Sequence, residues 1–326
     1  MANILSAIHR RESDIGARDD LVDIWPLRTG AGARLAEAVG KGHVSADERA
    51  RVEDFAAKGF TVFERCIEPE AVDALVEDVR GIKEHPGFFV TTDHRNGRPY
   101  KYSDESFDEF ESVFDLYVNF ESARRLCFHP TLLRFLKLVF EAEPLAFQAL
   151  LFQRSNQHPI HQDTAYVCLE HPLQMLASWI ALEDVVPGRG ELTYYEGSHR
   201  IPHRFFRDGS KRFMPGVDDA DETREHILAE CRRLGCEKRD FFAKKGDVLI
   251  WAADLAHGSN PRTRPEAETR KALVTHYCPE WTRPFYFRFL PDNRGIETHR
   301  GGASMASYYY CLPAGGVMLR PNFRVR

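Results

Sequence analysis

Long apolar runs are missing from this 326-residue sequence, and their absence argues against a membrane protein. No stretch approaches the roughly 20 apolar residues that a helix needs to cross a bilayer. Residues 1–24 are interrupted by a charged run at 9–14, so they contain no apolar core of signal-peptide length. We therefore expect a cytoplasmic protein with no membrane partner.

Cysteine is scarce as well, and positive charge does not predominate. The seven cysteines include no CxxC pair, so the sequence indicates neither a disulfide framework nor a thiolate zinc site. With 44 Lys and Arg against 49 Asp and Glu, the formal net charge is -5, which argues against a nucleic-acid partner. Hydrophobic residues make up 43% of the chain, and this is enough to bury one large core.

The most informative residues present are His161 and Asp163, with a further histidine, His257, much later in the chain. Side chains two residues apart in an extended segment point to the same face, so His161 and Asp163 can reach one ion. His257 follows a predicted buried strand at 247–251 and precedes a Gly-Ser-Asn-Pro run that ends it. Two imidazoles and one carboxylate, with the opposite face of the metal open, are the ligand set of non-haem Fe(II) oxygenases.

Other polar residues lie near these three in the sequence. Arg270 follows on the next strand-like run, and a buried guanidinium there needs a bidentate anion such as the distal carboxylate of 2-oxoglutarate. His276 lies at even spacing from Arg270, so a regular strand would point both to one side. We interpret His276 as a hydrogen-bonded interior histidine, with a fourth ligand as the alternative. His158 could pair with His161 instead, but Pro159 between them indicates a loop.

Five segments occur in an order that is more specific than any one of them. They are residues 54–72, the segment containing His161 and Asp163, residues 178–185, residues 190–200, and residues 246–259 followed by Arg270. Together they resemble the phytanoyl-CoA dioxygenase family of Fe(II)/2-oxoglutarate oxygenases, over roughly residues 50–285.

The resemblance implies Fe(II), 2-oxoglutarate and O2 as cofactors. It implies that His161, Asp163 and His257 bind the iron. It further implies that Arg270 and Ser259 hold the far carboxylate of 2-oxoglutarate and that Trp179 lines the cosubstrate pocket. Gln148 matches a family glutamine on the strand before the metal motif. Phe152 stands where some relatives place a polar side chain, so the cosubstrate contacts are not fully reproduced. Related halogenases replace the carboxylate ligand with a small residue, so Asp163 favours hydroxylation over halogenation.

Hydrophobic patterning predicts the fold. Residues 69–79 and 130–140 have helical periodicity with proline at the start. From residue 147 the pattern changes to short apolar stretches bounded by Gly, Pro and Asp, as at 176–182, 192–195 and 273–277. We predict a mainly β protein with flanking helices, whose core is a double-stranded β-helix (jelly roll, cupin-like). This single domain would span residues 46–326, after a polar N-terminal arm at residues 1–45.

Two segments keep more than one interpretation, and a third is a candidate lid. The basic segment, residues 199–212, is either a lid whose cations meet a carboxylate or phosphate on the substrate, or solvated surface charge. Residues 88–102 are a second candidate lid. The tail at 283–326 has three tyrosines at 308–310, which could stack on a ligand, but we expect them to pack in the core or an interface.

The sequence therefore predicts an Fe(II)/2-oxoglutarate-dependent dioxygenase. We expect it to hydroxylate an unactivated carbon of a small or medium organic substrate, with release of succinate and CO2. An anionic substrate and a homo-oligomeric assembly are both left open. One alternative is desaturation, epoxidation or cyclisation by the same machinery in natural-product biosynthesis. The other is a non-catalytic jelly-roll binding protein, which would leave Arg270 and Ser259 without a function.

Overall fold

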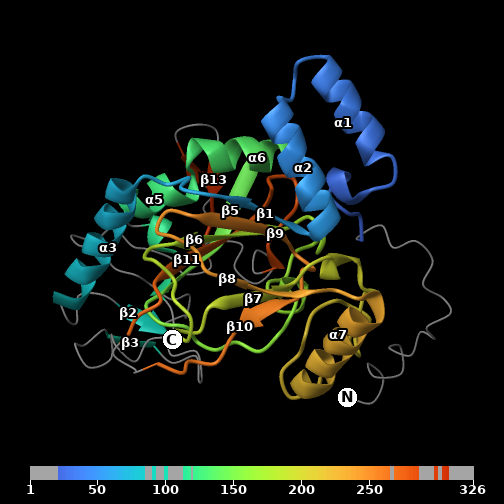
Figure 1. Cartoon of the computed structure of the whole chain (residues 1–326). Coiled ribbons are helices and arrows are strands. Elements are labelled where there is room, and N and C mark those ends of the chain that lie inside the picture. The colour runs from blue at the N-terminus through green and yellow to red at the C-terminus, as the bar shows by residue number, and fades with distance from the viewer. Residues whose placement is uncertain are drawn as a thin grey trace.

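Two β-sheets stack at the centre of the computed structural model (Figure 1). The structure describes residues 21–84, 90–92, 99–101, 113–118, 120–264, 268–285, 297–299 and 303–307. The major sheet runs in the order β1 (Phe60–Phe63), β9 (Val248–Ala252), β6 (Leu176–Ala181), β11 (Ala272–Pro279), β5 (Pro144–Phe152), β13 (Ala303–Met305) and β12 (Glu297–His299), and β4 (Val113–Phe114) also pairs with β5. The minor sheet is β10 (His257–Ser259), β7 (Leu192–Tyr195) and β8 (Lys238–Phe241). β2 (Val90–Thr92) and β3 (Pro99–Lys101) form a separate hairpin.

The major sheet is covered on both faces, and the strand β9 illustrates the consequence for sequence. All five of its residues are apolar because each packs into one of two hydrophobic clusters. Val248, Ile250 and Ala252 belong to the hydrophobic cluster under the helices. The alternating residues Leu249 and Trp251 belong instead to the cluster shared with the minor sheet. A strand covered on both sides needs apolar residues at every position, and its period of two decides which face each one serves.

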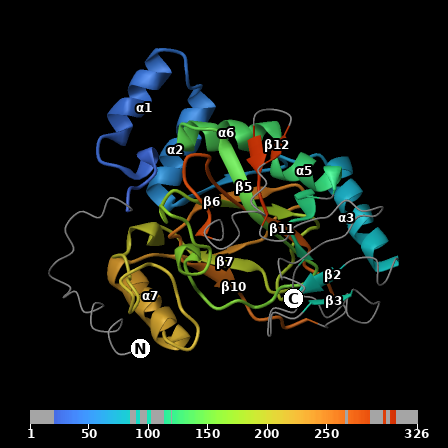
Figure 2. The same ribbon diagram turned by 180° about the vertical axis from the view of Figure 1, so that it is seen from behind.

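Helices cover the outer face of the major sheet, and one further helix lies beside the minor sheet (Figures 1 and 2). The first group is α2 (Ala46–Lys58), α3 (Pro69–Glu84), α5 (Glu121–Cys127) and α6 (Pro130–Phe140), and the helix beside the minor sheet is α7 (Ala220–Leu234). The helix α1 (Ala31–Gly40) packs against α2. Short 3-10 turns occur at η3 (Trp25–Leu27), η4 (Leu116–Val118), η5 (Asp163–Ala165) and η6 (Ser198–Arg200). α6 begins at its proline, and the two helices expected from periodicity are α3 and α6.

Residues of the expected N-terminal arm pack on the helical layer. Trp25 and Leu35 are buried in the same hydrophobic cluster as α2 and α6. The indole Nε1 of Trp25 donates a hydrogen bond of 2.8 Å to the carbonyl of Leu138. α2 then begins at Ala46, after the N-cap Ser45, which forms a capping box with Glu48. The domain boundary at residue 45 stays a prediction.

The predicted fold class is confirmed, with antiparallel sheets that form a jelly-roll core. Among the described residues no helix is long and apolar enough to cross a membrane. The six cysteines in the described part of the chain are free thiols. Most of the candidate lid at 88–102 lies outside the described residues, as does the tail at 308–326 with its three tyrosines.

Candidate metal centre

A backbone bridge brings the two predicted histidine ligands together. The N–H of His161 donates to the carbonyl of His257, and the N–H of His257 donates to the carbonyl of His161, each at 2.9 Å. Gly258 allows this close approach, because a Cβ there would lie 2.8 Å from the carbonyl oxygen of His158. The long sequence separation between the ligands is therefore closed by main-chain pairing.

The three predicted metal ligands converge at this bridge. His161, Asp163 and His257 each place one ligand atom within 4.8 Å of the others. Oδ1 of Asp163 lies 3.6 Å from Nε2 of His161 and 3.5 Å from Nε2 of His257. His161 and Asp163 point to one side because the intervening residue is extended, with φ -117° and ψ 135°. The spacing argument is thus reproduced by the structure.

Each ligand is oriented by a second contact. Nδ1 of His161 lies 2.9 Å from the carbonyl of Pro159, and Nδ1 of His257 lies 2.9 Å from the carbonyl of Leu255. Carbonyl acceptors at Nδ1 leave Nε2 of both rings as the lone-pair nitrogen that a metal needs. Trp251 donates its indole N–H to Oδ2 of Asp163 at 2.8 Å, so Oδ1 is the oxygen left facing the imidazoles.

The protonation of the three groups suits a divalent cation. Burial lowers the pKa of His257 to about 4, so its imidazole is neutral at neutral pH. Burial acts to raise the pKa of Asp163, but the nearby histidines outweigh it and hold that pKa well below its usual range. Burial also opposes charge on His161, yet contact with Asp163 raises its pKa. A metal ion at the carboxylate would compete with that proton for Nε2.

The ligands open into a cavity of about 510 Å³, which we call the metal cavity. Its wall includes the remaining predicted cosubstrate residues, Gln148, Trp179, Ser259 and Arg270, all of which line this one space. His158 lies on the wall too, but it is outside the group of three ligands. Tyr166, Asp221 and Arg224 add aromatic and charged groups to an otherwise largely apolar lining.

His276 is buried on the cavity wall, as expected from its even spacing to Arg270. The expected hydrogen bond is absent, since neither ring nitrogen has a hydrogen-bond partner among the described residues. Nε2 of His276 lies 3.5 Å from Oδ2 of Asp163, beyond the usual length of an N–H···O bond. The group of three ligand atoms does not include it.

Arg270 is a buried cation without a counter-ion. It is 3% exposed, and its guanidinium has no ion-pair partner among the described residues. Its Nε has no hydrogen-bond acceptor either. The guanidinium carbon lies 5.5 Å from the ring centre of Trp179 and 6.0 Å from that of Phe152. Burial lowers its pKa to about 10, against a weaker opposite effect of Glu183 and Glu191, so the group is still charged at neutral pH and has no anion in contact.

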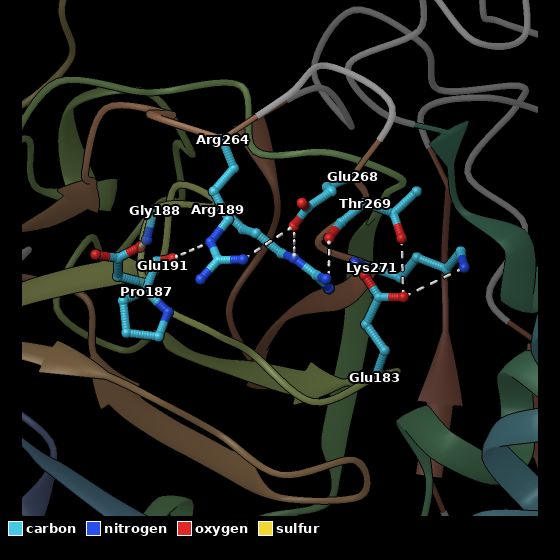
Figure 3. A network of polar contacts seen from close by, with 9 residues as sticks. All are labelled: Glu183, Pro187, Gly188, Arg189, Glu191, Arg264, Glu268, Thr269 and Lys271. Carbon is cyan, nitrogen blue, oxygen red and sulfur yellow. Dashed lines mark hydrogen bonds and ion pairs between the residues drawn. The ribbon is translucent and has the colours of Figure 1, made fainter.

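The residues on both sides of Arg270 form hydrogen bonds and ion pairs that involve two carboxylates, Glu183 and Glu268 (Figure 3). Glu183 accepts the hydroxyl of Thr269 at 2.9 Å and the main-chain N–H of Lys271 at 2.8 Å. Glu268 pairs with Arg189 at 2.7 Å. Because its neighbours satisfy these carboxylates, the guanidinium of Arg270 remains available to a ligand.

The basic segment fits neither of its two interpretations fully. No residue of 199–212, all of which the structure describes, lines the metal cavity, so these cations do not face a substrate there. Arg207 and Arg212 are exposed, as surface charge would be. Lys211, however, is 4% exposed and pairs with Asp254 at 2.9 Å. The expectation of solvated charge is wrong for this lysine, because a buried carboxylate binds it.

The residues fit the two groups that the sequence analysis expected. The two imidazoles and one carboxylate are a donor set suited to Fe(II) with positions left open. An orphaned guanidinium in the same cavity suits the far carboxylate of 2-oxoglutarate, since a planar fork binds a carboxylate through two hydrogen bonds.

Sequence reasoning missed the partners that hold these groups. Trp251 was recognised as part of a buried strand, and the period of two could have placed it on the cavity face. Asp254 and Glu183 offered no such signal, because their partners come from distant segments.

Comparison with known proteins adds a family and related folds. A sequence profile of the phytanoyl-CoA dioxygenase family matches residues 55–271. The peroxisomal phytanoyl-CoA dioxygenase of Mus musculus is 24% identical in an alignment of 187 residues that covers 53% of this chain and 48% of that protein. The phytanoyl-CoA dioxygenase domain-containing protein 1 homolog of Dictyostelium discoideum is 29% identical over 120 residues, or 36% of this chain and 39% of that protein. The chain spans about half the length, or less, of these curated relatives.

Solved structures share the fold. The epimerase SnoN, crystallised with Fe3+, alpha ketoglutarate and nogalamycin RO, superposes with a TM-score of 0.55 at 18% identity, covering 84% of this chain and 98% of that chain. EctD from S. alaskensis with bound Fe gives a TM-score of 0.54 at 20% identity, covering 74% of this chain and 79% of that chain.

Proposed function

The chain belongs to the phytanoyl-CoA dioxygenase family, and from that premise we propose that it is an Fe(II)/2-oxoglutarate-dependent oxygenase that hydroxylates an unactivated carbon of a small or medium organic molecule. Fe(II), 2-oxoglutarate and O2, expected from the sequence, are the cofactors of this family. The proposed iron ligands are His161, Asp163 and His257.

One observation carries the proposal. A group of three metal-ligand side chains and an unpaired buried guanidinium line the same cavity. A jelly-roll binding protein with a structural metal would need only the first of these. A buried cation without a counter-ion costs stability unless something binds it. The unpaired state of Arg270 therefore supports a cavity built for an anionic cosubstrate.

The residues of the cavity divide the work between them. When bound, Fe(II) with 2-oxoglutarate and O2 supplies an oxidation that converts the keto acid to succinate and CO2. Arg270 would hold the far carboxylate, with Ser259 beside it and Trp179 as a wall. Trp251 keeps Oδ1 of Asp163 directed at the two imidazoles. The apolar lining excludes water from the reacting groups.

The substrate's fate is the finer part of the proposal. Similar folds serve an epimerase and a carbocyclase, so the same scaffold supports several outcomes. We favour hydroxylation because the carboxylate ligand Asp163 is present and an oxygen transfer is the simplest use of this site. Gain of one oxygen atom in the product would support it, whereas loss of two hydrogen atoms would indicate desaturation or ring closure.

Anaerobic titration tests the proposal directly. Fe(II) followed by 2-oxoglutarate should produce the weak visible charge-transfer band of a keto acid chelated to iron. Asp163→Ala should remove the band and weaken Fe(II) binding. Asp184→Ala, which removes an exposed carboxylate bonded to Lys244, should leave both unchanged. If the parent protein shows no band and Asp163→Ala binds Fe(II) as the parent does, the oxygenase proposal is wrong.

A further inference from the structure

Asp254 lies in the turn between β9 and β10, three residues before the ligand His257, and is 4% exposed. Its side chain is not part of the metal cavity. Burying a carboxylate alone costs on the order of several kcal/mol, unless neighbouring groups replace the hydrogen bonds that it loses from water. The groups that compensate here come from two segments, the one that contains His161 and Asp163 and the basic segment.

The first of these segments contains the ligands His161 and Asp163. Thr164 donates its hydroxyl to Oδ1 of Asp254 at 2.5 Å. Gln162 donates its amide to the main-chain carbonyl of Asp254 at 2.7 Å. The residue between the two ligands and the residue after them are therefore both bonded to the turn that leads to the third ligand.

The second segment is the basic segment. Lys211 reaches Oδ2 of Asp254 at 2.9 Å, and Nδ1 of His203 lies 3.1 Å from the same oxygen. The chain then continues to Phe213, whose N–H donates to the carbonyl of Ala165 at 2.8 Å. The buried lysine thus holds the basic segment against the back of the ligand segment, away from the metal cavity.

These contacts suggest a role beyond stability. A buried ion pair is often no more stabilising than an apolar pair of the same volume, so stability alone is a weak reason for Lys211 and Asp254. Groups that hydrogen-bond to metal ligands, in contrast, set metal affinity by fixing ligand orientation. Asp254 acts one step further out, through Gln162 and Thr164 beside the ligands. Oδ1 of Asp254 fixes Thr164, and Oδ2 is held in place by Lys211.

We propose that Asp254, held by Lys211, is a positioning residue that acts beside the main-chain bridge of His161 and His257 and keeps the two ligand segments aligned. The proposal rests on the metal centre assigned under the proposed function. It gives the basic segment a task, which is to hold the carboxylate that aligns the ligands.

Thr164→Val tests the idea with the smallest change, because valine keeps the shape and loses the hydroxyl. We expect Fe(II) affinity, measured by anaerobic titration, to fall about 10-fold, the lower end of the range for partners bonded directly to a ligand. Thr164→Ser restores the donor and should bind Fe(II) within a few-fold of the parent. Thr282→Val is the matched control: it also removes a buried hydroxyl, here one bonded to His171, and should leave Fe(II) affinity unchanged.

Lys211→Met probes the other side of the carboxylate, and we expect weaker Fe(II) binding there too. Thermal unfolding of every variant without metal separates a positioning effect from a general loss of structure. If Lys211→Met does not fold, Thr164→Val decides alone. Parent-like Fe(II) affinity in folded Thr164→Val would overturn the inference. A parent protein that binds Fe(II) but shows no band with 2-oxoglutarate would contradict the proposed function instead. The Fe(II) affinities of the parent and the Thr164 variants would still test the positioning role of Asp254.

Discussion

Replacing Arg270 by methionine should have opposite effects on stability and on cosubstrate binding. Burial lowers the pKa of this guanidinium to about 10, which corresponds to roughly 3 kcal/mol that the charged group costs the folded state. Because the folded pKa lies below the unfolded one, this cost is present at every pH below about 10 and is relieved only as the side chain deprotonates. Methionine fills similar space beside Trp179 and Phe152 without the charge. At roughly 2 °C per kcal/mol, the ligand-free protein should melt up to about 6 °C higher.

The same substitution should weaken 2-oxoglutarate binding. Removing one partner of a buried, hydrogen-bonded charge pair costs about 2–5 kcal/mol. At 1.4 kcal/mol per tenfold, the Kd for 2-oxoglutarate should rise roughly 30- to 4,000-fold. Fe(II) affinity should not change, because Arg270 is outside the ligand group.

Calorimetric melting with and without 2-oxoglutarate, together with an anaerobic titration of the charge-transfer band, measures both effects. Arg270→Lys serves as the control, since it keeps the charge but loses the planar fork, and should show intermediate affinity with no gain in stability. A methionine variant that melts lower than the parent and keeps a parent-like Kd would refute the reasoning on both counts.

Three further substitutions test the supports of the site. Trp251→Phe removes the hydrogen-bond donor to Asp163 and should lower Fe(II) affinity about 10- to 100-fold, measured by anaerobic titration. Unchanged Fe(II) affinity would show that the indole does not orient Asp163. Gly258→Ala places a Cβ 2.8 Å from the carbonyl of His158, so denaturant unfolding should show a loss of about 1–3 kcal/mol. Glu183→Gln weakens the hydrogen bonds of Glu183 to Thr269 and Lys271, beside Arg270. It should raise the Kd for 2-oxoglutarate roughly fivefold, or about 1 kcal/mol, without affecting Fe(II) binding; an unaltered Kd would contradict a supporting role for Glu183.

The sequence was informative wherever a local period determined the outcome. The side chains of His161 and Asp163 share a face because one extended residue separates them, and Arg270 and His276 line one cavity because six residues is an even spacing on a strand. The buried strand before His257 followed from its unbroken apolar run. Each of these inferences needs only a few neighbouring residues.

Long-range partners were beyond such reasoning. Lys211 was expected to be solvated because its sequence neighbours are basic. Its burial is compensated by an ion pair with Asp254, which comes from a turn distant in the sequence. The helix α7 was not identified either, since its sequence is strongly charged and buries just Thr223, Ile227 and Cys231. Its capping aspartate, Asp219, was the available signal.

The reciprocal main-chain bonds between His161 and His257 have a practical consequence for handling the protein. Imidazoles held by the main chain are already in place before any ion binds. The site therefore needs little rearrangement for any first-row divalent metal, and rearrangement cannot select iron over the others. Nickel, copper and zinc generally outrank ferrous iron at nitrogen and oxygen donors. If the proposed function holds, a preparation exposed to nickel resin or trace zinc should carry those ions in place of iron, so its iron content should be assayed before its activity is judged.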